Sequence, residues 1–162
     1  MEHRTRDISS DPAVLSVIAL GLLIGFGAFF VASVPVRWVA FAADRTTKDG
    51  VYSDPQAQRG KTQYTQTCAV CHMEDLSGNG SAPPLVGDPF AFTWNGHTAD
   101  ELFNLIRTTM PQSNPNSLPP GTVVDIIAYL FQANGAPAGH DDLKSEAAAL
   151  KNIAIQVKQS GR

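Results

Sequence analysis

One long hydrophobic run stands near the start of the chain, and polar residues dominate the rest. No charged residue occurs from Pro12 to Val36, and 24 of the 31 residues from 13 to 43 are hydrophobic. A helix of about 20 apolar residues crosses a bilayer core, whereas the core of a signal peptide has only about 7–15 residues. The run therefore predicts a retained transmembrane helix over residues 13–36, preceded by a short polar N-terminus, 1–12.

Two other interpretations fit part of the same pattern. Ala40-Phe41-Ala42 resembles a small-residue cleavage site, and cleavage near Ala43 would release a soluble protein. A buried helix of a soluble core is disfavoured because the run has no polar face. Basic residues flank both ends of the run, so the positive-inside rule does not set its orientation.

Helices and loops are predicted for the remainder of the chain. The apolar spacing or capping signals of helices occur in four stretches: 56–71, Ala99–Thr109, Val123–Gln132 and 142–158. Thr98 and Glu101 have the spacing of a capping box at the start of the second helix, and Asn134-Gly135 is a stop signal after the third. Two stretches rich in glycine and proline, 73–96 and 111–121, are predicted to be loops. Since no strand with clear alternation is found, the predicted fold class is all-α.

The part after the hydrophobic run divides into a linker, 37–55, a globular domain, 56–139, and a C-terminal helical tail, 140–162. The linker has turn residues but no periodicity. The domain has about 84 residues and few large apolar ones, so it needs something else to pack around. The tail has one apolar stripe, which either packs on the domain or docks to a partner subunit: Leu143, Ala147, Leu150, Ala154 and Val157.

Composition and charge exclude several classes of protein. The formal net charge is −3 without a basic cluster, which argues against nucleic acid as the main partner. Two cysteines are too few for a disulfide-dense scaffold or for a four-cysteine zinc or iron–sulfur site.

The two cysteines fall in one motif, Cys68-Ala69-Val70-Cys71-His72. This C-x-x-C-H pattern is typical of c-type haem attachment, because two thiols three residues apart can bond both vinyl groups of one porphyrin and the next residue places an imidazole under the iron. A thioredoxin-like redox pair would need a βαβ context, which is missing. Half of a zinc site would need two more ligands, and only His3, His97 and His140 remain.

The iron ligated by His72 has a sixth position, which methionine or histidine usually occupies in electron-transfer cytochromes. Met110 is the predicted ligand, because it follows a helix and precedes Pro111, where the chain can turn toward the metal. Met1 lies outside the domain, and Met73 is too close to His72 to reach the opposite face. The alternative ligands are His97 and His140. An open sixth position would instead indicate a haem sensor or a haem enzyme.

With these motifs, residues 56–137 resemble the class I cytochrome c family. Gly60 and Tyr64 look like the first-helix pair that packs on the last helix, and Tyr129-Leu130 look like its partner. The resemblance implies three to four helices around one covalently attached haem c, with an N-terminal transmembrane helix added here. The stretch from Trp94 to Gly135 is most similar to cytochrome domains that accept electrons from quinoprotein alcohol dehydrogenases.

The resemblance also implies roles for single residues. Pro83-Pro84-Leu85 is similar to the Pro-x-Leu of the family, so the Pro83 carbonyl would accept a hydrogen bond from His72 Nδ1 and Leu85 would touch the haem. Met110-Pro111 looks like the axial-methionine loop. Further candidates have structural alternatives. Trp94 could donate to a haem propionate or be plain core, and Arg107 could do the same or be a solvated helix residue. The predicted pocket wall, which is also core, consists of Phe90, Phe92, Leu102 and Ile106. Ser77–Ser81 lacks the lysine and the following helix of a phosphate site, so a flexible loop is predicted there.

Haem held by histidine and methionine implies a one-electron carrier of fairly high potential rather than an enzyme, with no catalytic residue. Haem is attached to such motifs outside the bacterial cytoplasm, so the resemblance implies a periplasmic haem domain on the inner membrane and a cytoplasmic N-terminus. The expected partners are redox proteins of the membrane, with no nucleic acid and no small-molecule substrate. A fixed subunit of a dehydrogenase or photosynthetic complex is the alternative to a mobile carrier.

Overall fold

The computed structural model describes residues 44–159. The chain divides into two units, Met1–Val39 and Ala40–Arg162, and only the second is described. The predicted transmembrane run, the N-terminus before it and the possible cleavage site lie outside the described residues. Within the described residues, no helix is long and apolar enough to cross a membrane.

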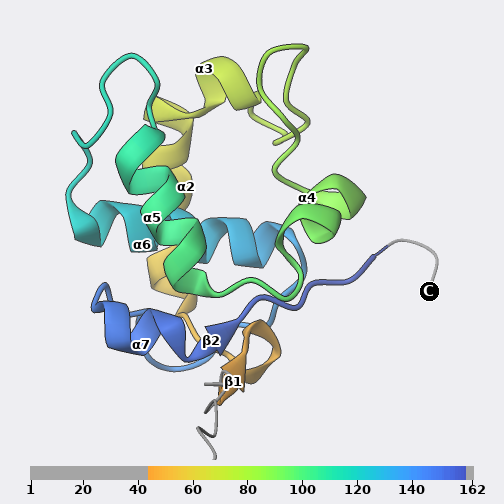
Figure 1. Cartoon of the computed structure of the whole chain (residues 1–162), viewed down its shortest axis with the longest axis vertical. Coiled ribbons are helices and arrows are strands. Elements are labelled where there is room, and N and C mark those ends of the chain that lie inside the picture. Colours follow the sequence, from red (N-terminus) through yellow and green to blue (C-terminus); the bar gives the residue numbers. More distant parts are fainter. Residues whose placement is uncertain (1–43, 160–162) are drawn as a thin grey trace, which may run out of the picture. The chain divides into compact units, whose positions relative to one another are not determined.

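The described residues form a mostly helical domain with a minimal parallel sheet (Figure 1). The elements in chain order are β1 (Arg45–Thr46), η1 (Thr47–Asp49), α2 (Asp54–Thr67), α3 (Ala69–His72), α4 (Gly87–Trp94), α5 (Ala99–Thr109), α6 (Pro120–Ala133), α7 (Ala147–Lys151) and β2 (Ile153–Ala154). The predicted helix over Ala99–Thr109 is confirmed with its bounds, and the one over Val123–Gln132 is confirmed as part of α6. The predicted helix over 56–71 is divided between α2 and α3.

The crossing of α2 and α6 is the most extensive contact between two elements of the domain. Gly60 lies so close to α6 that a Cβ atom there would be 1.8 Å from the carbonyl oxygen of Asp125. One turn later, the rings of Tyr64 and Tyr129 pack with their centroids 5.4 Å apart. The predicted packing of the Gly60–Tyr64 pair on the last helix is thus confirmed, and only glycine permits this approach.

Side-chain caps set where two of the helices begin. Thr98 Oγ1 accepts from the backbone N–H of Glu101, and Glu101 Oε2 accepts from the backbone N–H of Thr98 at 2.6 Å. This reciprocal capping box satisfies two donors that the first turn of a helix leaves unpaired. Ser53 caps α2 with a single side-chain bond, in which Ser53 Oγ accepts from the backbone N–H of Gln56 at 3.2 Å.

The predicted loop over residues 73–96 is wrong in its last third, because Gly87–Trp94 forms α4. Glycine and proline make this stretch look like a loop, but Pro89 lies in the first turn, where a helix needs no backbone donor. Phe90, Ala91 and Trp94 fall on one side of the helix, and Phe90 and Ala91 are fully buried. The apolar side of α4, rather than its composition, stabilises the helix.

The predicted linker also needs correction over its second half. Thr47, Val51, Tyr52 and Ser53 are all at most 5% exposed. The Tyr52 hydroxyl donates to the carbonyl of Ala136 at 2.6 Å. Residues 45–53 are therefore an integral part of the domain rather than a spacer.

The predicted C-terminal helix over 142–158 is wrong as well. Only Ala147–Lys151 is helical, and Ile153–Ala154 then pairs in parallel with Arg45–Thr46. Ile153, Ile155 and Val157 are buried while Gln156 between them is exposed, which is the two-residue period of a strand. The predicted alternative that the tail packs on the domain is confirmed, since Leu143 and Leu150 are buried too.

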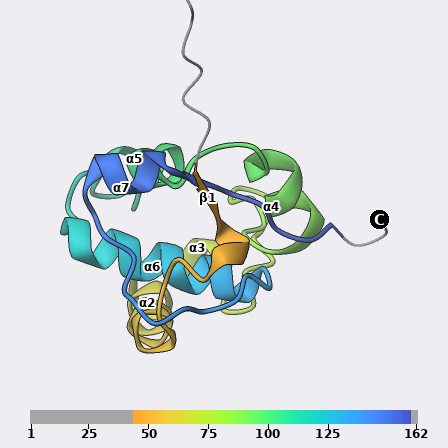
Figure 2. The same ribbon diagram turned by 90° about the horizontal axis from the view of Figure 1, so that it is seen from below.

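Figure 2 shows α7 beside α5, with the following segment running toward α4. The segment after α7 therefore extends along one side of the domain.

We predict that Gly60→Ala lowers the free energy of unfolding of the haem-loaded protein by about 2 kcal/mol or more, because the added methyl group displaces the backbone of α6. Gly121→Ala in α6 is the matched control, since a Cβ atom there meets nothing within 4 Å, and we expect a change below about 1 kcal/mol. Guanidinium unfolding followed by circular dichroism measures both. Equal effects of the two substitutions would contradict the close crossing.

Candidate haem site

The attachment motif lies at the end of α2 and on α3. The backbone N–H of His72 donates to the carbonyl of Cys68 at 2.9 Å, so that one helical turn carries both thiols and the imidazole. Cys68 is partly buried, Cys71 is exposed and His72 is 8% exposed. Burial, with the neighbouring Cys71 as a smaller cause, raises the pKa of the Cys68 thiol to about 11.

The His72 ring has a fixed orientation. Its Nδ1 donates to the carbonyl oxygen of Pro83 at 2.9 Å, which is the hydrogen bond that the sequence resemblance implies. Nε2 has no partner among the described residues, and with Nδ1 holding the proton its lone pair points away from the backbone. A carbonyl acceptor of this kind selects the tautomer and raises the basicity of a metal-ligating histidine.

The loop that carries Pro83 has its own hydrogen bonds, and the expectation of a loop over Ser77–Ser81 is confirmed while its flexibility stays a prediction. Asn79 Nδ2 donates to the carbonyl of Cys71 at 2.9 Å, and its Oδ1 accepts from the N–H groups of Ser81 and Ala82. The N–H of Gly78 donates to the carbonyl of His72 at 3.0 Å. The acceptor for His72 Nδ1 is therefore tied to the same helical turn as His72 itself.

A second amide fixes the other end of this loop. Asn134 is 9% exposed, and its Nδ2 donates to the carbonyls of Leu85 and Leu130 at 3.0 and 2.8 Å. Its Oδ1 accepts from the N–H of Gly87 at 3.0 Å. The sequence marks Asn134 as a helix stop, and no signal in the sequence shows that it also holds Leu85 and the start of α4.

Tyr64 stabilises the attachment turn with a hydrogen bond to its backbone. Its hydroxyl donates to the carbonyl of Met73 at 2.7 Å. Burial of the ring raises the pKa of Tyr64, with the nearby Cys68 as the next cause. The neutral phenol therefore persists at every physiological pH, and the hydrogen bond persists with it.

Met110 caps the C-terminus of α5 in an extended conformation and is partly buried against the core. Figure 1 shows the C-terminal end of α5 and α3 toward the same end of the domain. His97 precedes the other end of this 11-residue helix, so about 16 Å of helix separates it from Met110. Met110 fits the predicted sixth ligand better than His97 does, and the assignment stays a prediction.

The predicted pocket wall is confirmed as buried apolar surface at three of its four positions, Phe90, Leu102 and Ile106. Phe92 is wrong as a core residue, because it is 87% exposed. Two helical positions turn the side chain by about 200°, so Phe92 points away from the side that buries Phe90. Leu85 and Trp94 are partly buried against the core.

Two donors near the core have no acceptor among the described residues. They are the indole N–H of Trp94 and the guanidinium of Arg107, and both side chains are partly buried. The Trp94 ring lies between Phe90 and His97, at centroid distances of 6.4 and 5.7 Å. Since no buried side-chain nitrogen among the described residues lacks a partner, both donors are open to solvent in this structure. A haem offers two carboxylates, so these donors fit its propionates, as the thiols and the Nε2 of His72 fit its vinyl groups and iron.

We predict that Asn79→Ala lowers the free energy of unfolding by about 0.5–1.5 kcal/mol. The carbonyl of Cys71 and the N–H of Ser81 lose their partner, and the N–H of Ala82 keeps only the carbonyl of Asn79. The circular dichroism of the Soret band should weaken at the same time, since the Pro83 carbonyl no longer fixes the imidazole. Asn104→Ala on the exposed side of α5 is the control and should stay within about 0.5 kcal/mol. An unchanged Soret signal in Asn79→Ala would contradict the coupling of this loop to His72.

One family model and one solved structure match parts of this chain. Residues 55–130 match the family model described as "Cytochrome C oxidase, cbb3-type, subunit III". The fold is similar to a chain in the crystal structure of the sulfane dehydrogenase SoxCD from Paracoccus pantotrophus, with a TM-score of 0.46 and 18% identity. That alignment covers 67% of this chain and 62% of the other, so the chain spans less than two thirds of its length. No curated protein sequence matches the chain.

The family match contains the attachment motif, the residues that orient His72 and the close helix crossing at Gly60. Residues 55–130 are therefore similar to a cytochrome c family domain, which implies covalently bound haem c, and Cys68 and Cys71 fit its attachment motif.

Proposed function

We propose that this protein carries one electron at a time at the periplasmic face of the inner membrane, tethered by residues 13–36. Its donor would be a substrate-oxidising or quinol-oxidising complex, and its acceptor a terminal oxidase or another redox protein. The observation that carries the proposal is the hydrogen bond from His72 Nδ1 to Pro83, which prepares Nε2 as one axial ligand while Met110 ends α5 on the side of α3.

When bound, haem c supplies a couple between Fe(III) and Fe(II). The chain determines how that couple behaves. His72 and Met110 would hold the iron, and two protein ligands would leave no open site for oxygen or a substrate. The buried side chains Phe90, Leu102 and Ile106 exclude water, and a low-polarity site disfavours the additional charge of the ferric state. Both effects raise the reduction potential.

The charge distribution favours a partner with a basic face. No Lys or Arg occurs between Lys61 and Arg107, whereas this stretch contains five acidic residues: Glu74, Asp75, Asp88, Asp100 and Glu101. Exposed Val70 and Met73 lie beside Glu74 on the attachment turn. A small apolar patch with acidic neighbours suits a partner with a complementary basic surface. Such charge complementarity increases the association rate more than it increases the affinity.

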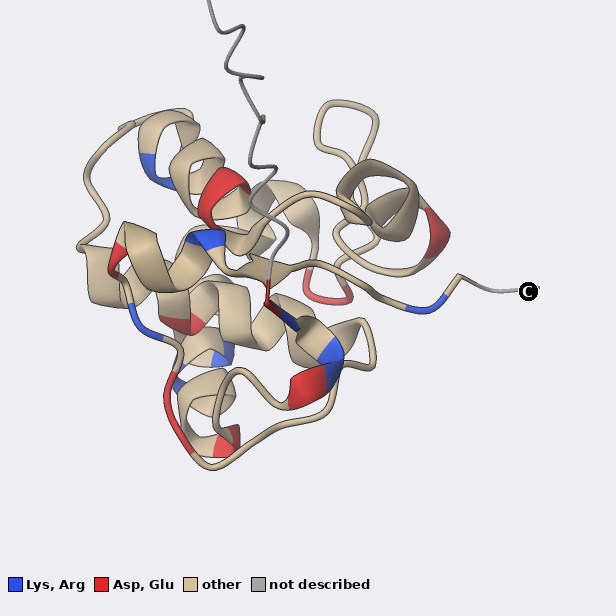
Figure 3. Ribbon diagram, turned by 60° about the horizontal axis from the view of Figure 1, so that its bottom comes forward, with Lys and Arg blue, Asp and Glu red and all other residues tan. Residues whose placement is uncertain are grey.

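Lysines at the other end of the domain do not form a docking ring. Figure 3 shows Lys and Arg interspersed with Asp and Glu around η1 and α7, and Lys48 is followed directly by Asp49. A docking mode through a lysine ring is therefore not part of the proposal.

A fixed subunit of a membrane complex is the second candidate. The description of the matched family names a subunit of an oxidase, and this observation supports permanent association with larger subunits. The link to quinoprotein dehydrogenases that the sequence suggests belongs to the same candidate. A haem sensor or enzyme with a labile Met110 is the third.

We predict that Met110→Ala removes the sulfur–iron absorption band of the ferric protein, lowers the midpoint potential and lets the reduced protein bind carbon monoxide. The open position then accepts an exogenous ligand. Met73→Leu is the matched control, because Met73 is exposed and adjoins His72, and its spectrum should equal that of the natural chain. An unchanged spectrum in Met110→Ala would move the assignment to His97 or His140, and rapid carbon monoxide binding by the natural chain would favour the sensor.

We predict that the full chain sediments with membranes and is released by detergent, with residues 13–36 retained. N-terminal sequencing of the mature protein and a detergent extraction measure this directly. A mature start near Ala43 and recovery in the soluble fraction would establish a soluble periplasmic carrier. Comigration with large subunits in stoichiometric amount would establish the fixed-subunit candidate instead.

A further inference from the structure

The segment Asn152–Val157, called the C-terminal strap here, is hydrogen-bonded on two sides. On one side, Ile153–Ala154 pairs with Arg45–Thr46. On the other side, the N–H of Gly96 donates to the carbonyl of Ile155 at 3.0 Å, and the N–H of Ile155 donates to the carbonyl of His97 at 2.8 Å. The strap therefore lies between the first strand of the domain and the loop from 95 to 98 that joins α4 to α5.

Asn95 extends this ladder with its side chain. Its Nδ2 donates to the carbonyl of Val157 at 3.1 Å, and its Oδ1 accepts from the N–H of Val157 at 2.8 Å. The N–H and the oxygen of the Asn95 amide thus both bond to the backbone of Val157, in the way that the peptide groups of a neighbouring strand would. Alanine cannot replace either bond, and aspartate can replace only the acceptor.

The loop held in this way begins at Trp94. Asn95 N–H donates to the carbonyl of Ala91 and ends α4, and His97 N–H donates to the carbonyl of Trp94, both at 3.0 Å. The indole ring is packed on Phe90 and His97, and its N–H has no acceptor among the described residues. A shift of the loop would therefore move an indole donor that points at no other described group.

We propose that Asn95 and the C-terminal strap are positioning elements for the haem, acting through Trp94. The strap holds the loop so that the indole N–H meets a haem propionate. This inference rests on haem binding by the domain and deepens the proposed electron-transfer function, since the charge on a propionate affects the potential of the iron. Losing one donor leaves that charge less compensated and stabilises Fe(III), which lowers the potential.

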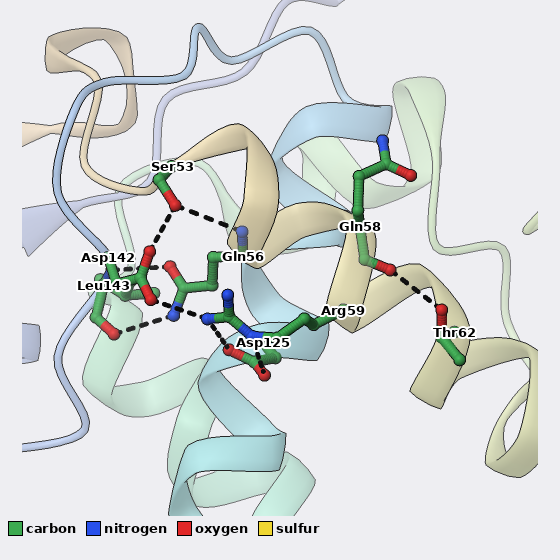
Figure 4. Close-up of polar contacts among 8 residues, drawn as sticks. All are labelled: Ser53, Gln56, Gln58, Arg59, Thr62, Asp125, Asp142 and Leu143. Atoms are coloured by element: carbon green, nitrogen blue, oxygen red, sulfur yellow. Dashed lines mark hydrogen bonds and ion pairs between the residues drawn. The ribbon is translucent and has the colours of Figure 1, made fainter.

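The chain provides a matched control for this role. Gln56 is 1% exposed, and its side chain forms the same pair of bonds with the backbone of Leu143, at 3.0 and 2.7 Å. Figure 4 shows Gln56 and Leu143 beside Arg59, which pairs with Asp125 and Asp142. This attachment holds the tail to α2, at the far end of the tail from the loop that begins at Trp94.

The test compares Asn95→Ala with Gln56→Ala in the haem-loaded protein. Both should lower the free energy of unfolding, because each leaves a buried peptide group unpaired. Only Asn95→Ala should speed amide hydrogen exchange at Gly96 and lower the midpoint potential. At a fixed solution potential, the ratio of oxidised to reduced protein should change by about tenfold, which is the scale of one charge-assisted hydrogen bond. Asn95→Asp serves if the alanine variant does not fold, with a smaller shift in the same direction.

Two outcomes would overturn the inference. An unchanged potential in Asn95→Ala, despite faster exchange at Gly96, would show that the strap only stabilises the domain. Equal potential shifts in Asn95→Ala and Gln56→Ala would show a general loosening instead.

Trp94→Phe separates this inference from the proposed function. It should lower the potential, and Asn95→Ala in the Trp94→Phe background should then add no further shift. If Trp94→Phe leaves the potential unchanged, the positioning role fails, while the axial-ligand experiment on Met110 still decides the function.

Discussion

The contact of Gly60 with the backbone of α6 is the constraint on which the rest of the structure depends. It fixes the direction of α2, and α2 continues directly into the turn with Cys68 and His72. The same α6 ends at Asn134, which binds Leu85 and the start of α4. One helix therefore orients both the imidazole of His72 and the loop that supplies its acceptor, so that one crossing holds His72 from two sides.

Side-chain amides replace regular secondary structure wherever loops surround this crossing. Four of them bind backbone groups of the loops or of the tail: Gln56, Asn79, Asn95 and Asn134. Each offers both a donor and an acceptor. A domain with few large apolar residues gains order from such bonds, because a buried peptide group without a partner is costly. The tail, the Pro83 loop and the α4–α5 loop are all fixed in this way.

The sequence predicts those features whose signals are local. The capping box of Thr98 and Glu101 predicts the start of α5, and the attachment motif predicts its turn. The tail shows where local signals fail to predict the structure. Its apolar residues fit the stripe of a helix, but Ile153, Ile155 and Val157 also alternate as in a strand. Pairing with Arg45–Thr46, more than 100 residues earlier, decides between the two periods. The roles of Asn95 and Asn134 depend on equally distant partners, which no spacing along the chain reveals.

Helix α2 separates residues 45–53, at its N-terminal end, from the attachment turn at its C-terminal end. The helix begins at Asp54, next to Ser53, which bridges to Gly139, and it ends just before Cys68. Fourteen helical residues span about 21 Å. Residues 45–53 therefore join the domain at one end of this helix, and the exposed Val70 lies on the turn at the other end. Because a rigid helix spans the distance, the residues at which the described domain begins lie well apart from the attachment turn and its acidic neighbours Glu74 and Asp75.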